Sequence, residues 1–206
     1  MNYMQFSPRI LRETSRGLNR VSPEDIMFQR REIWLSGEIT SDTADCMNSQ
    51  LLYLAADSPD REITIYINSP GGQVNAGLAI YDVMQAIPCK IRTVCVGTAA
   101  SMAAVLFSAG NRREILPHSE ILIHDPLVPR GVSGSALEVQ EKSSRLMGVR
   151  KIICNILAKH TGKTLRQIYQ VSRKDTWFEA EKAVEFGLAD TIVDNLFPKE
   201  SEERGY

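Results

Sequence analysis

The sequence has 206 residues, of which 43% are hydrophobic and 24% are charged, and its formal net charge is -1. This length and composition predict one folded domain, 1–206, and exclude a disordered chain. The near-zero net charge provides no summed positive field, so we expect neither nucleic acid nor an anionic membrane as a partner.

Targeting signals and cysteine usage indicate where the protein works. The first residues lack the apolar core of a secretory signal, and the longest apolar stretch, 94–109, is shorter than the roughly 20 residues that a membrane-spanning helix needs. The cysteines lie in apolar segments without Cys-x-x-Cys spacing, and we expect small buried side chains in a reducing compartment. They are Cys46, Cys89, Cys95 and Cys154. The predicted location is the cytoplasm.

Strands and helices alternate along the first half of the chain. A strand is expected at 32–39 and another at 63–67, where Ser-Pro-Gly-Gly ends it. Between them, Ser41 or Asp42 is expected to cap a helix. The residues at helical spacing that would form its buried face are Ala44, Met47, Leu51 and Leu54.

The same alternation continues beyond residue 72. We expect a helix at 73–87, a strand at 90–97, a short helix at 101–109 and a buried strand at 119–126. Strands that alternate with helices over this length predict a parallel sheet with helical crossovers on its faces.

The last third begins with the longest expected helix, 135–160, which Gly162 would end. Its apolar stripe is confined to its second half, so we expect the first half to project beyond the core. A strand, a helix and a last strand follow within 175–193, and a polar tail ends the sequence.

Three loops that leave the carboxyl ends of expected strands carry reactive groups: 69–72, 97–102 and 124–126. Ligands bind at these strand ends in open α/β folds, so we expect the loops to converge. Ser101 begins a helix in the second loop, and His124 begins the third. Taken alone, the serine also fits an N-cap and the histidine also fits a structural bond to a carbonyl.

Together with Gly71 and Gly72, these residues predict nucleophilic catalysis. Such chemistry needs a hydroxyl, a base that removes its proton, and backbone N–H donors aimed at the developing oxyanion. Glycines expose N–H groups without obstruction, although the pair also fits an ordinary tight turn. The alanines around Ser101 are expected to leave room for a substrate backbone.

Other site chemistries find less support. Neither Walker nor Gly-x-Gly-x-x-Gly spacing is present, and Ser101 is not in a Gly-x-Ser-x-Gly elbow. His118 and His160 are interpreted as a turn residue and a helix C-terminal residue. No group of His, Cys and Asp has metal-ligand spacing, so no metal is expected.

Several segments in the same order resemble the proteolytic subunit of the Clp protease, the ClpP family. They are INSPGG (67–72), AGLAIYDVMQ (76–85), GTAASMAA (97–104), ILIHDP (121–126), LAKHTGK (157–163) and AVEFGLAD (183–190), with ETSRG (13–17) near the start. The resemblance implies an α/β, ClpP/crotonase-like fold of repeated β-β-α units with a projecting handle helix. It also divides the domain into an N-terminal axial segment (1–20), a handle strand and helix (127–161) and a polar tail (198–206).

The resemblance also implies the chemistry and the partners. Residue by residue, it places the nucleophile at Ser101, the general base at His124 and the oxyanion donors at the N–H groups of Gly72 and Met102. The implied activity is that of a serine endopeptidase without cofactors, acting on unfolded polypeptides. The implied assembly is a tetradecamer of two stacked heptameric rings, homomeric or heteromeric, fed by an AAA+ unfoldase of the ClpX, ClpA or ClpC type.

The sequence departs from the family pattern at the third triad position. Where the family has an Asp that orients the histidine, the ungapped match is Val171, which cannot accept the imidazole N–H. We interpret Asp175, displaced along the same loop, as the third member, and a backbone carbonyl that holds His124 is the alternative. This departure favours a weakened or assembly-dependent active site.

A second departure concerns the unfoldase. Tyr66 keeps one aromatic docking position of the family, but Thr64 and Ala86 stand where aromatic residues are common. Smaller side chains there remove buried area, which brings docking into doubt. We therefore expect a divergent paralogue that assembles with a complete sister subunit.

Three functions follow in order of support. The first is a serine endopeptidase subunit of a self-compartmentalised ring protease. The second is a catalytically weak ring subunit that acts mainly as a scaffold for an active sister. The third, an acyl-CoA hydratase or isomerase of the same fold, gives no reason for both Ser101 and His124.

Overall fold

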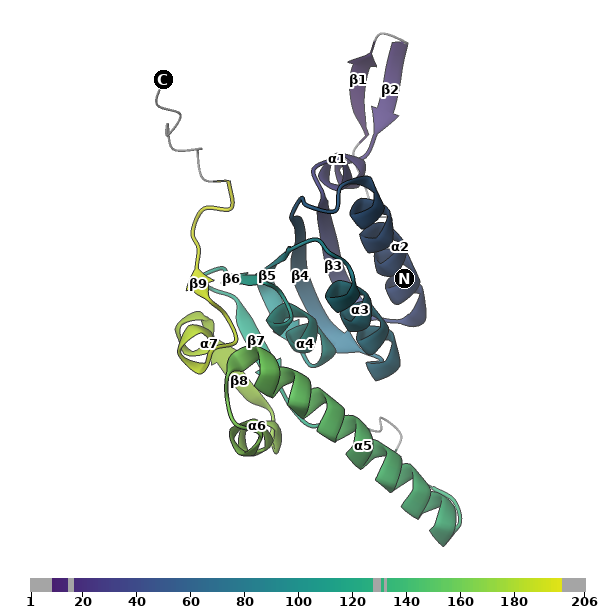
Figure 1. The fold of residues 1–206 in the computed structure, drawn as a ribbon, viewed down its shortest axis with the longest axis vertical. Helices are drawn as coiled ribbons and strands as arrows, with labels where there is room; N and C mark the ends of the chain where they lie inside the picture. The colour runs from purple at the N-terminus through teal and green to yellow at the C-terminus, as the bar shows by residue number, and fades with distance from the viewer. Residues whose placement is uncertain (1–8, 15–16, 128–130, 132, 198–206) are drawn as a thin grey trace.

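The computed structural model describes residues 9–14, 17–127, 131 and 133–197. Within them, a seven-stranded sheet forms the body of the molecule (Figure 1). Its parallel path runs through β3 (Glu32–Ile39), β4 (Ile63–Gly72), β5 (Ile91–Ala100), β6 (Arg112–Ile115) and β9 (Thr191–Ile192). The predicted parallel α/β sheet is confirmed.

The long strand β5 has two successive neighbours on one side. Its first half, Arg92–Cys95, pairs with β6, and its second half, Thr98–Ala100, pairs with β7 (Glu120–Ile123). β8 (Thr176–Glu179) then pairs with β7 in the antiparallel direction. The sheet therefore divides beside the carboxyl end of β5, where the expected site lies.

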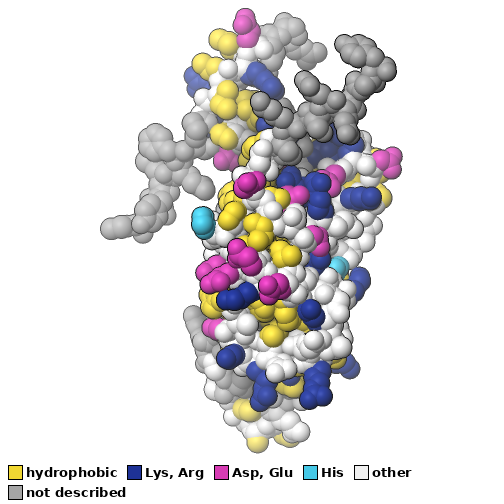
Figure 2. Space-filling view, turned by 90° about the vertical axis from the view of Figure 1, so that its left-hand side faces the viewer, with side chains coloured by type: hydrophobic (Ala, Val, Ile, Leu, Met, Phe, Trp, Pro, Cys, Tyr) yellow, Lys and Arg dark blue, Asp and Glu magenta, His cyan; other side chains and the backbone are white. Residues whose placement is uncertain are grey.

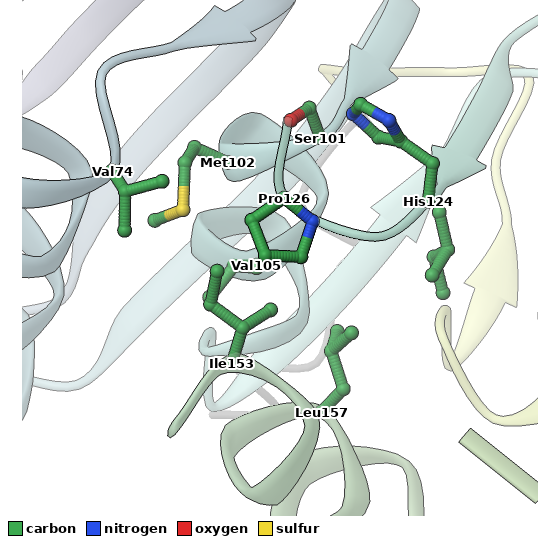
Figure 3. Close-up of a pocket in the computed structure, with 9 residues that line it drawn as sticks. Val74, Ser101, Met102, Val105, His124, Pro126, Ile153 and Leu157 are labelled. Atoms are coloured by element: carbon green, nitrogen blue, oxygen red, sulfur yellow. The ribbon is translucent and has the colours of Figure 1, made fainter. Parts of the chain in front are cut away.

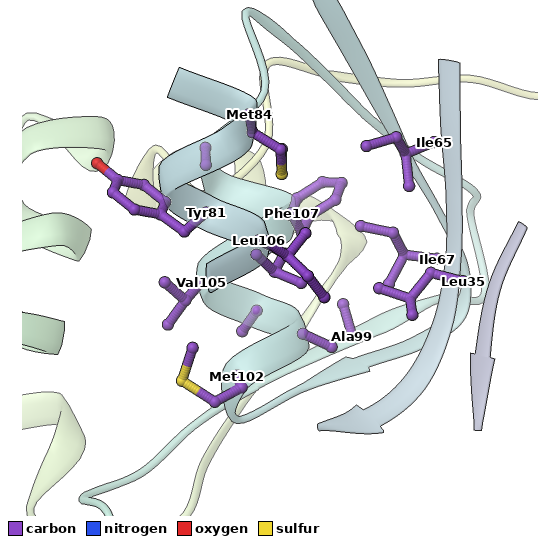
Figure 4. Packing of buried hydrophobic residues seen from close by; sticks show 14 of the residues in the cluster. Leu35, Ile65, Ile67, Tyr81, Met84, Ala99, Met102, Val105, Leu106 and Phe107 are labelled. Carbon is purple, nitrogen blue, oxygen red and sulfur yellow. The ribbon is translucent and has the colours of Figure 1, made fainter. Parts of the chain in front are cut away.

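Helices α2 (Ser41–Asp57), α3 (Val74–Ala86) and α4 (Met102–Ser108) pack on one side of the sheet (Figure 1). Every residue of α4 is buried. Figure 4 shows its apolar side chains, such as Phe107, between strand residues Ile65 and Ile67 and the α3 residues Tyr81 and Met84. Burial of these apolar surfaces holds the helix that starts beside Ser101 in a fixed position.

The first predicted helix is confirmed with a different cap. Its cap is Thr40, whose side chain accepts a hydrogen bond from the Thr43 N–H, and not Ser41 or Asp42. The four residues predicted to form its buried face are all buried: Ala44, Met47, Leu51 and Leu54. The apolar spacing therefore located this helix. The helix begins one residue earlier than predicted, at Ser41, so Thr40 occupies the cap position.

The strand predicted at 63–67 was too short, because β4 continues to Gly72. Pairing with β3 persists to the contact between Ile39 and Gly72, so the Ser-Pro-Gly-Gly segment belongs to the sheet. The register between β3 and β4 shifts between Ser36 and Glu38. The turn residues in the sequence do not reveal this irregularity or the continued pairing.

Elements at both ends of the chain were not predicted. β1 (Ile10–Thr14) and β2 (Gly17–Val21) pair as antiparallel strands that stand away from the sheet, and α1 (Pro23–Gln29) follows (Figure 1). Helix α6 (Leu165–Ser172) was also missed. The polar tail 198–206 and most of the predicted handle strand lie outside the described residues.

The long helix α5 (Ala136–Thr161) projects well beyond the sheet, as predicted (Figure 1). Ser135 and Glu138 form a capping box at its start, and Gly162 ends it with φ of 70°. Its buried residues all lie in its second half: Ile153, Cys154 and Leu157. The polar first half therefore extends away from the core.

The face that carries α6 and α7 (Ala180–Phe186) is strongly charged. Figure 2 shows acidic side chains gathered near α7 and basic side chains further toward the projecting end, at the level of α6. Within the described ranges, no helix combines the length and apolar character needed to cross a membrane. The same residues contain no cluster of three or more His, Cys, Asp or Glu side chains suited to a metal ion.

Candidate active site

The sheet register brings the carboxyl ends of β4, β5 and β7 together. Ser69 of β4 pairs with Ala99 of β5, and Ala100 pairs with Leu122 of β7. The Ser101 N–H then donates to the Leu122 carbonyl oxygen at 2.9 Å. The three loops predicted to converge therefore do so, with Ser101 between the other two.

Ser101 has an unusual backbone conformation, with φ of 56° and ψ of -121°. Residues other than glycine rarely adopt such a positive φ. The backbone at Ser101 is therefore strained, and such strain persists only where the surrounding structure imposes it. Ser101 occupies the N-cap position of α4, but its side chain makes no capping hydrogen bond. The N-cap alternative therefore does not account for the hydroxyl.

The alanines around Ser101 do not open space for a substrate, and that expectation was wrong. They are almost fully buried, with exposed fractions between 0% and 4%: Ala99, Ala100, Ala103 and Ala104. Their small side chains let α4 pack closely on the sheet. On the β4 side, a glycine backbone lies directly against the Ser101 turn.

This glycine is Gly71, which has no side chain and so lets the β4 backbone approach the Ser101 turn closely. A Cβ at this position would be 2.5 Å from the Ala100 carbonyl oxygen and 2.7 Å from the Ser101 Cβ, and φ is 88°. Gly72 is equally constrained, because a Cβ there would be 2.3 Å from the Ile39 carbonyl oxygen. Both positions require glycine for steric reasons.

Ser69, which sequence reasoning missed, fixes this diglycine segment. It is 1% exposed, donates to the Gly37 carbonyl oxygen at 2.6 Å and accepts from the Gly71 N–H at 3.1 Å. The Gly71 N–H therefore makes a hydrogen bond within the turn. The next N–H along the chain belongs to Gly72, which is the predicted oxyanion donor. A serine directly before Pro-Gly-Gly was the available signal.

His124 and Ser101 line the same small pocket. Figure 3 shows them side by side at one end of it, with Met102 and Pro126 close by. Apolar side chains form the remaining walls: Val74, Val105, Ile123, Ile153 and Leu157. Among the described residues, no hydrogen bond joins the Ser101 hydroxyl to the His124 imidazole.

Asp175 and Val171 lie differently with respect to His124. The Asp175 Oδ1 is 3.8 Å from the His124 Nδ1, which is longer than a hydrogen bond, and the Asp175 side chain is 71% exposed. Val171 packs against the hydrophobic core, and its carbonyl oxygen accepts from the Thr176 hydroxyl at 2.7 Å. The structure therefore places a carboxylate near the imidazole, but from position 175.

A second buried serine supports the loop that leads to Ser101. Ser119 accepts from the Gly97 N–H at 2.8 Å and donates to the Cys95 carbonyl oxygen at 3.1 Å. It is 2% exposed. Sequence reasoning missed it because a lone serine beside a histidine carries no distinctive pattern.

The other nucleophilic and basic side chains near the core are poorly suited to catalysis. Burial raises the pKa of the Cys95 thiol to about 12, so it remains protonated and unreactive. Burial, with Lys159 and Arg113 nearby, lowers the pKa of His160 to about 4. Cys46 is exposed, which corrects the expectation that all four cysteines are buried.

The sheet face beside Tyr66 is polar at Thr64, one of the two positions where the family commonly has an aromatic docking residue. Thr64 is in register with Arg92 on β5, and Arg92 pairs with Glu114 of β6, with its Nε 2.9 Å from the carboxylate. Ala86 is the exposed last residue of α3. Tyr66 itself stacks at a tilt on Trp34, with ring centroids 5.7 Å apart.

Comparison with known protein families agrees with this geometry. The family model described as Clp protease matches residues 15–196, which is most of the chain. The chain belongs to the Clp protease family. It is accordingly a ClpP-like peptidase subunit with the mixed α/β fold of that family. Members of the Clp protease family form rings that work with Clp ATPases.

Proposed function

We propose that this chain is a serine endopeptidase subunit of a ring protease that cleaves unfolded polypeptides. The observation that carries the proposal is the strained Ser101, which lines one pocket with His124 and whose hydroxyl makes no capping bond. Strain of this kind at a functional residue is typical of a preorganised nucleophile. Family membership supports the same activity.

In the proposed reaction, the Ser101 Oγ attacks the carbonyl carbon of a peptide bond while the His124 imidazole takes the hydroxyl proton. The N–H groups of Gly72 and Met102 donate to the oxyanion of the tetrahedral intermediate. The C–N bond then breaks, and the imidazolium gives its proton to the leaving amine. Water, deprotonated by His124, then attacks the acyl ester, the C–O bond to Ser101 breaks, and the imidazolium returns its proton to the Ser101 Oγ as the carboxylic acid is released.

The groove next to the pocket suits an extended polypeptide. Val74 and Pro126 line both the pocket and an adjoining groove along α5. Apolar side chains and backbone line much of this groove, including Leu127, Gly131, Leu146 and Val149. We therefore place the substrate chain along α5, with the scissile bond over Ser101.

Ring assembly is part of the proposal. Helix α5 exposes several large apolar side chains along its projecting part, and self-association would cover them. They are Leu137, Val139, Met147 and Ile152, with exposed fractions of 37% to 78%. We propose heptameric rings stacked as a tetradecamer in the cytoplasm, and an AAA+ unfoldase that feeds it. Because the face at Thr64 and Arg92 is polar, we expect the unfoldase to dock weakly on this chain. A sister subunit in the same ring would then provide the main docking surface.

Covalent labelling tests the proposed nucleophile. A fluorophosphonate should label the assembled protein, and Ser101→Ala should abolish the labelling. Hydrolysis of a short fluorogenic peptide, measured with the chain alone and mixed with a candidate sister subunit, should show turnover that Ser101→Ala removes. Native mass spectrometry of the same samples reports the assembly.

The alternative is a ring subunit that contributes mainly walls and contacts. The long Asp175–His124 separation and the apolar Val171 favour this second function. It predicts that the assembled chain, alone and mixed with a sister subunit, is not labelled at Ser101. Labelling of Ser101 in either assembly would contradict it.

A further inference from the structure

The residue after the proposed base takes part in an ion pair that the reaction does not use. Strand β7 ends at Ile123, so His124 and Asp125 lie just beyond its last ladder pair. The Asp125 Oδ1 accepts a hydrogen bond from the Arg150 Nε of α5 at 2.8 Å. This bond connects the segment that carries His124 to a long helix.

Arg150 is itself held from a second side. Its guanidinium lies over the ring of Tyr169 on α6, 4.4 Å from the ring centroid. The Arg150 side chain is only 20% exposed, and the hydrogen bond that it donates to Asp125 raises the pKa of the guanidinium. Two partners on different elements therefore fix a permanently charged group next to the His124 segment.

The other anchors of His124 are weaker. The Asp175 carboxylate is mostly exposed and lies 3.8 Å from the ring, too far for a hydrogen bond. The position where the family carries an orienting Asp is Val171, whose side chain faces the core. The orientation of the imidazole thus depends on how firmly its own backbone is held.

We propose that Arg150 is a positioning residue that fixes His124 through Asp125. The inference rests on the proposed function, because it concerns the base of that reaction. Arg150 does not touch the substrate carbonyl in this scheme. It holds the turn after β7, and Tyr169 limits the positions that the guanidinium can take.

Paired variants test the proposal in whichever assembly, the chain alone or with its sister, is labelled by a fluorophosphonate. Arg150→Gln and Asp125→Asn should each lower kcat for a fluorogenic peptide by roughly tenfold to a hundredfold, since small displacements of a catalytic group have effects of this size. KM should change by less than about twofold, because the groove is intact. The charge-swapped double variant, Asp125→Arg with Arg150→Asp, should recover part of the loss.

The pH profile separates positioning from a general loss of stability. The charged groups near His124 are Asp125 on its own segment, Arg150 from α5 and Asp175 before β8. Arg150→Gln leaves the Asp125 carboxylate without its cation, so the acidic limb of kcat/KM should move to higher pH. Asp125→Asn leaves the guanidinium without its anion, so the same limb should move to lower pH.

Lys151→Gln is the matched control, since Lys151 is the exposed neighbour of Arg150 on the same helix. It should leave kcat and the pH profile unchanged. Wild-type kcat and pH profile in Arg150→Gln would overturn the inference while the proposed function stands. If Arg150→Gln fails to assemble, Asp125→Asn decides by the same criteria. Absence of labelling in the wild-type protein would overturn the proposed function and the inference with it.

Discussion

His124 and Asp175 face each other across the end of the β7–β8 ladder, with 3.8 Å between Nδ1 and Oδ1. The last antiparallel pair joins Ile123 to Thr176, so the next residues on the two strands are His124 and Asp175. Strand register therefore places this carboxylate near the imidazole. The family motif, in contrast, places the carboxylate four residues earlier, at Val171.

Asp175→Asn should lower peptidase activity by about tenfold, because the carboxylate stabilises the imidazolium from a distance and through solvent. Loss of the buried Asp of a complete serine-protease triad costs roughly four orders of magnitude. The measurement is kcat/KM for a fluorogenic peptide in the active assembly. Activity equal to wild type would remove Asp175 from the mechanism.

Val171 provides the matched comparison for Asp175. Val171→Ala should change kcat/KM by less than about twofold, since the side chain packs against the core and not against the ring. Val171→Asp should not raise activity and should lower the melting temperature, because it places a carboxylate against apolar side chains. A rise in kcat for Val171→Asp would show that position 171 does reach His124.

The sequence predicted the alternation of strands and helices well, since apolar spacing and turn residues mark β3, α2, α3 and α5 locally. It also predicted the convergence of the loops with Ser101 and His124, because parallel strand ends share one edge. It did not predict the strain at Ser101, the role of Ser69 or the ion pair between Asp125 and Arg150. These depend on register, on buried hydrogen bonds and on helix packing between residues far apart in the chain.

Gly71→Ala should reduce the rate at which a fluorophosphonate labels Ser101 by about a hundredfold. The added Cβ would meet the Ala100 carbonyl oxygen and the Ser101 Cβ, so the serine must move. The unfavourable φ should also lower the free energy of unfolding by roughly 1–3 kcal/mol. Gly148→Ala is the control: nothing lies within 4 Å of a Cβ there, and the helix should gain about 0.5–1 kcal/mol. Full labelling of Gly71→Ala would contradict the contact.

Stability should fall on acidification through His160. Burial lowers the pKa of its imidazole to about 4 from 6.5, so the unfolded chain takes up the proton first. The contribution of the neutral His160 imidazole to the free energy of unfolding is fully present above pH 6.5 and is lost as the pH falls toward 4. Because the ring is only partly buried, the loss should be on the order of 1–2 kcal/mol.

His160→Gln tests this dependence, since the amide can still bond the Tyr81 hydroxyl, which lies 3.1 Å from the His160 Nε2. Melting temperatures at a fixed chain concentration should fall less between pH 7 and pH 4.5 in this variant than in the wild-type protein. Parallel curves for the two proteins would assign the acid sensitivity to other groups.

Replacing the nucleophile by glycine or by alanine should separate its chemistry from its strain. Both variants lose the hydroxyl and should be inactive, but glycine adopts φ of 56° and ψ of -121° without the penalty of a Cβ. Ser101→Gly should therefore be more stable than Ser101→Ala by about 1–2 kcal/mol in urea unfolding. Ser49, exposed within α2, should show the opposite order, with its alanine variant about 1 kcal/mol more stable than its glycine variant. If alanine is the better residue at both positions, the backbone at Ser101 stores no strain, and preorganisation of the nucleophile loses its physical basis.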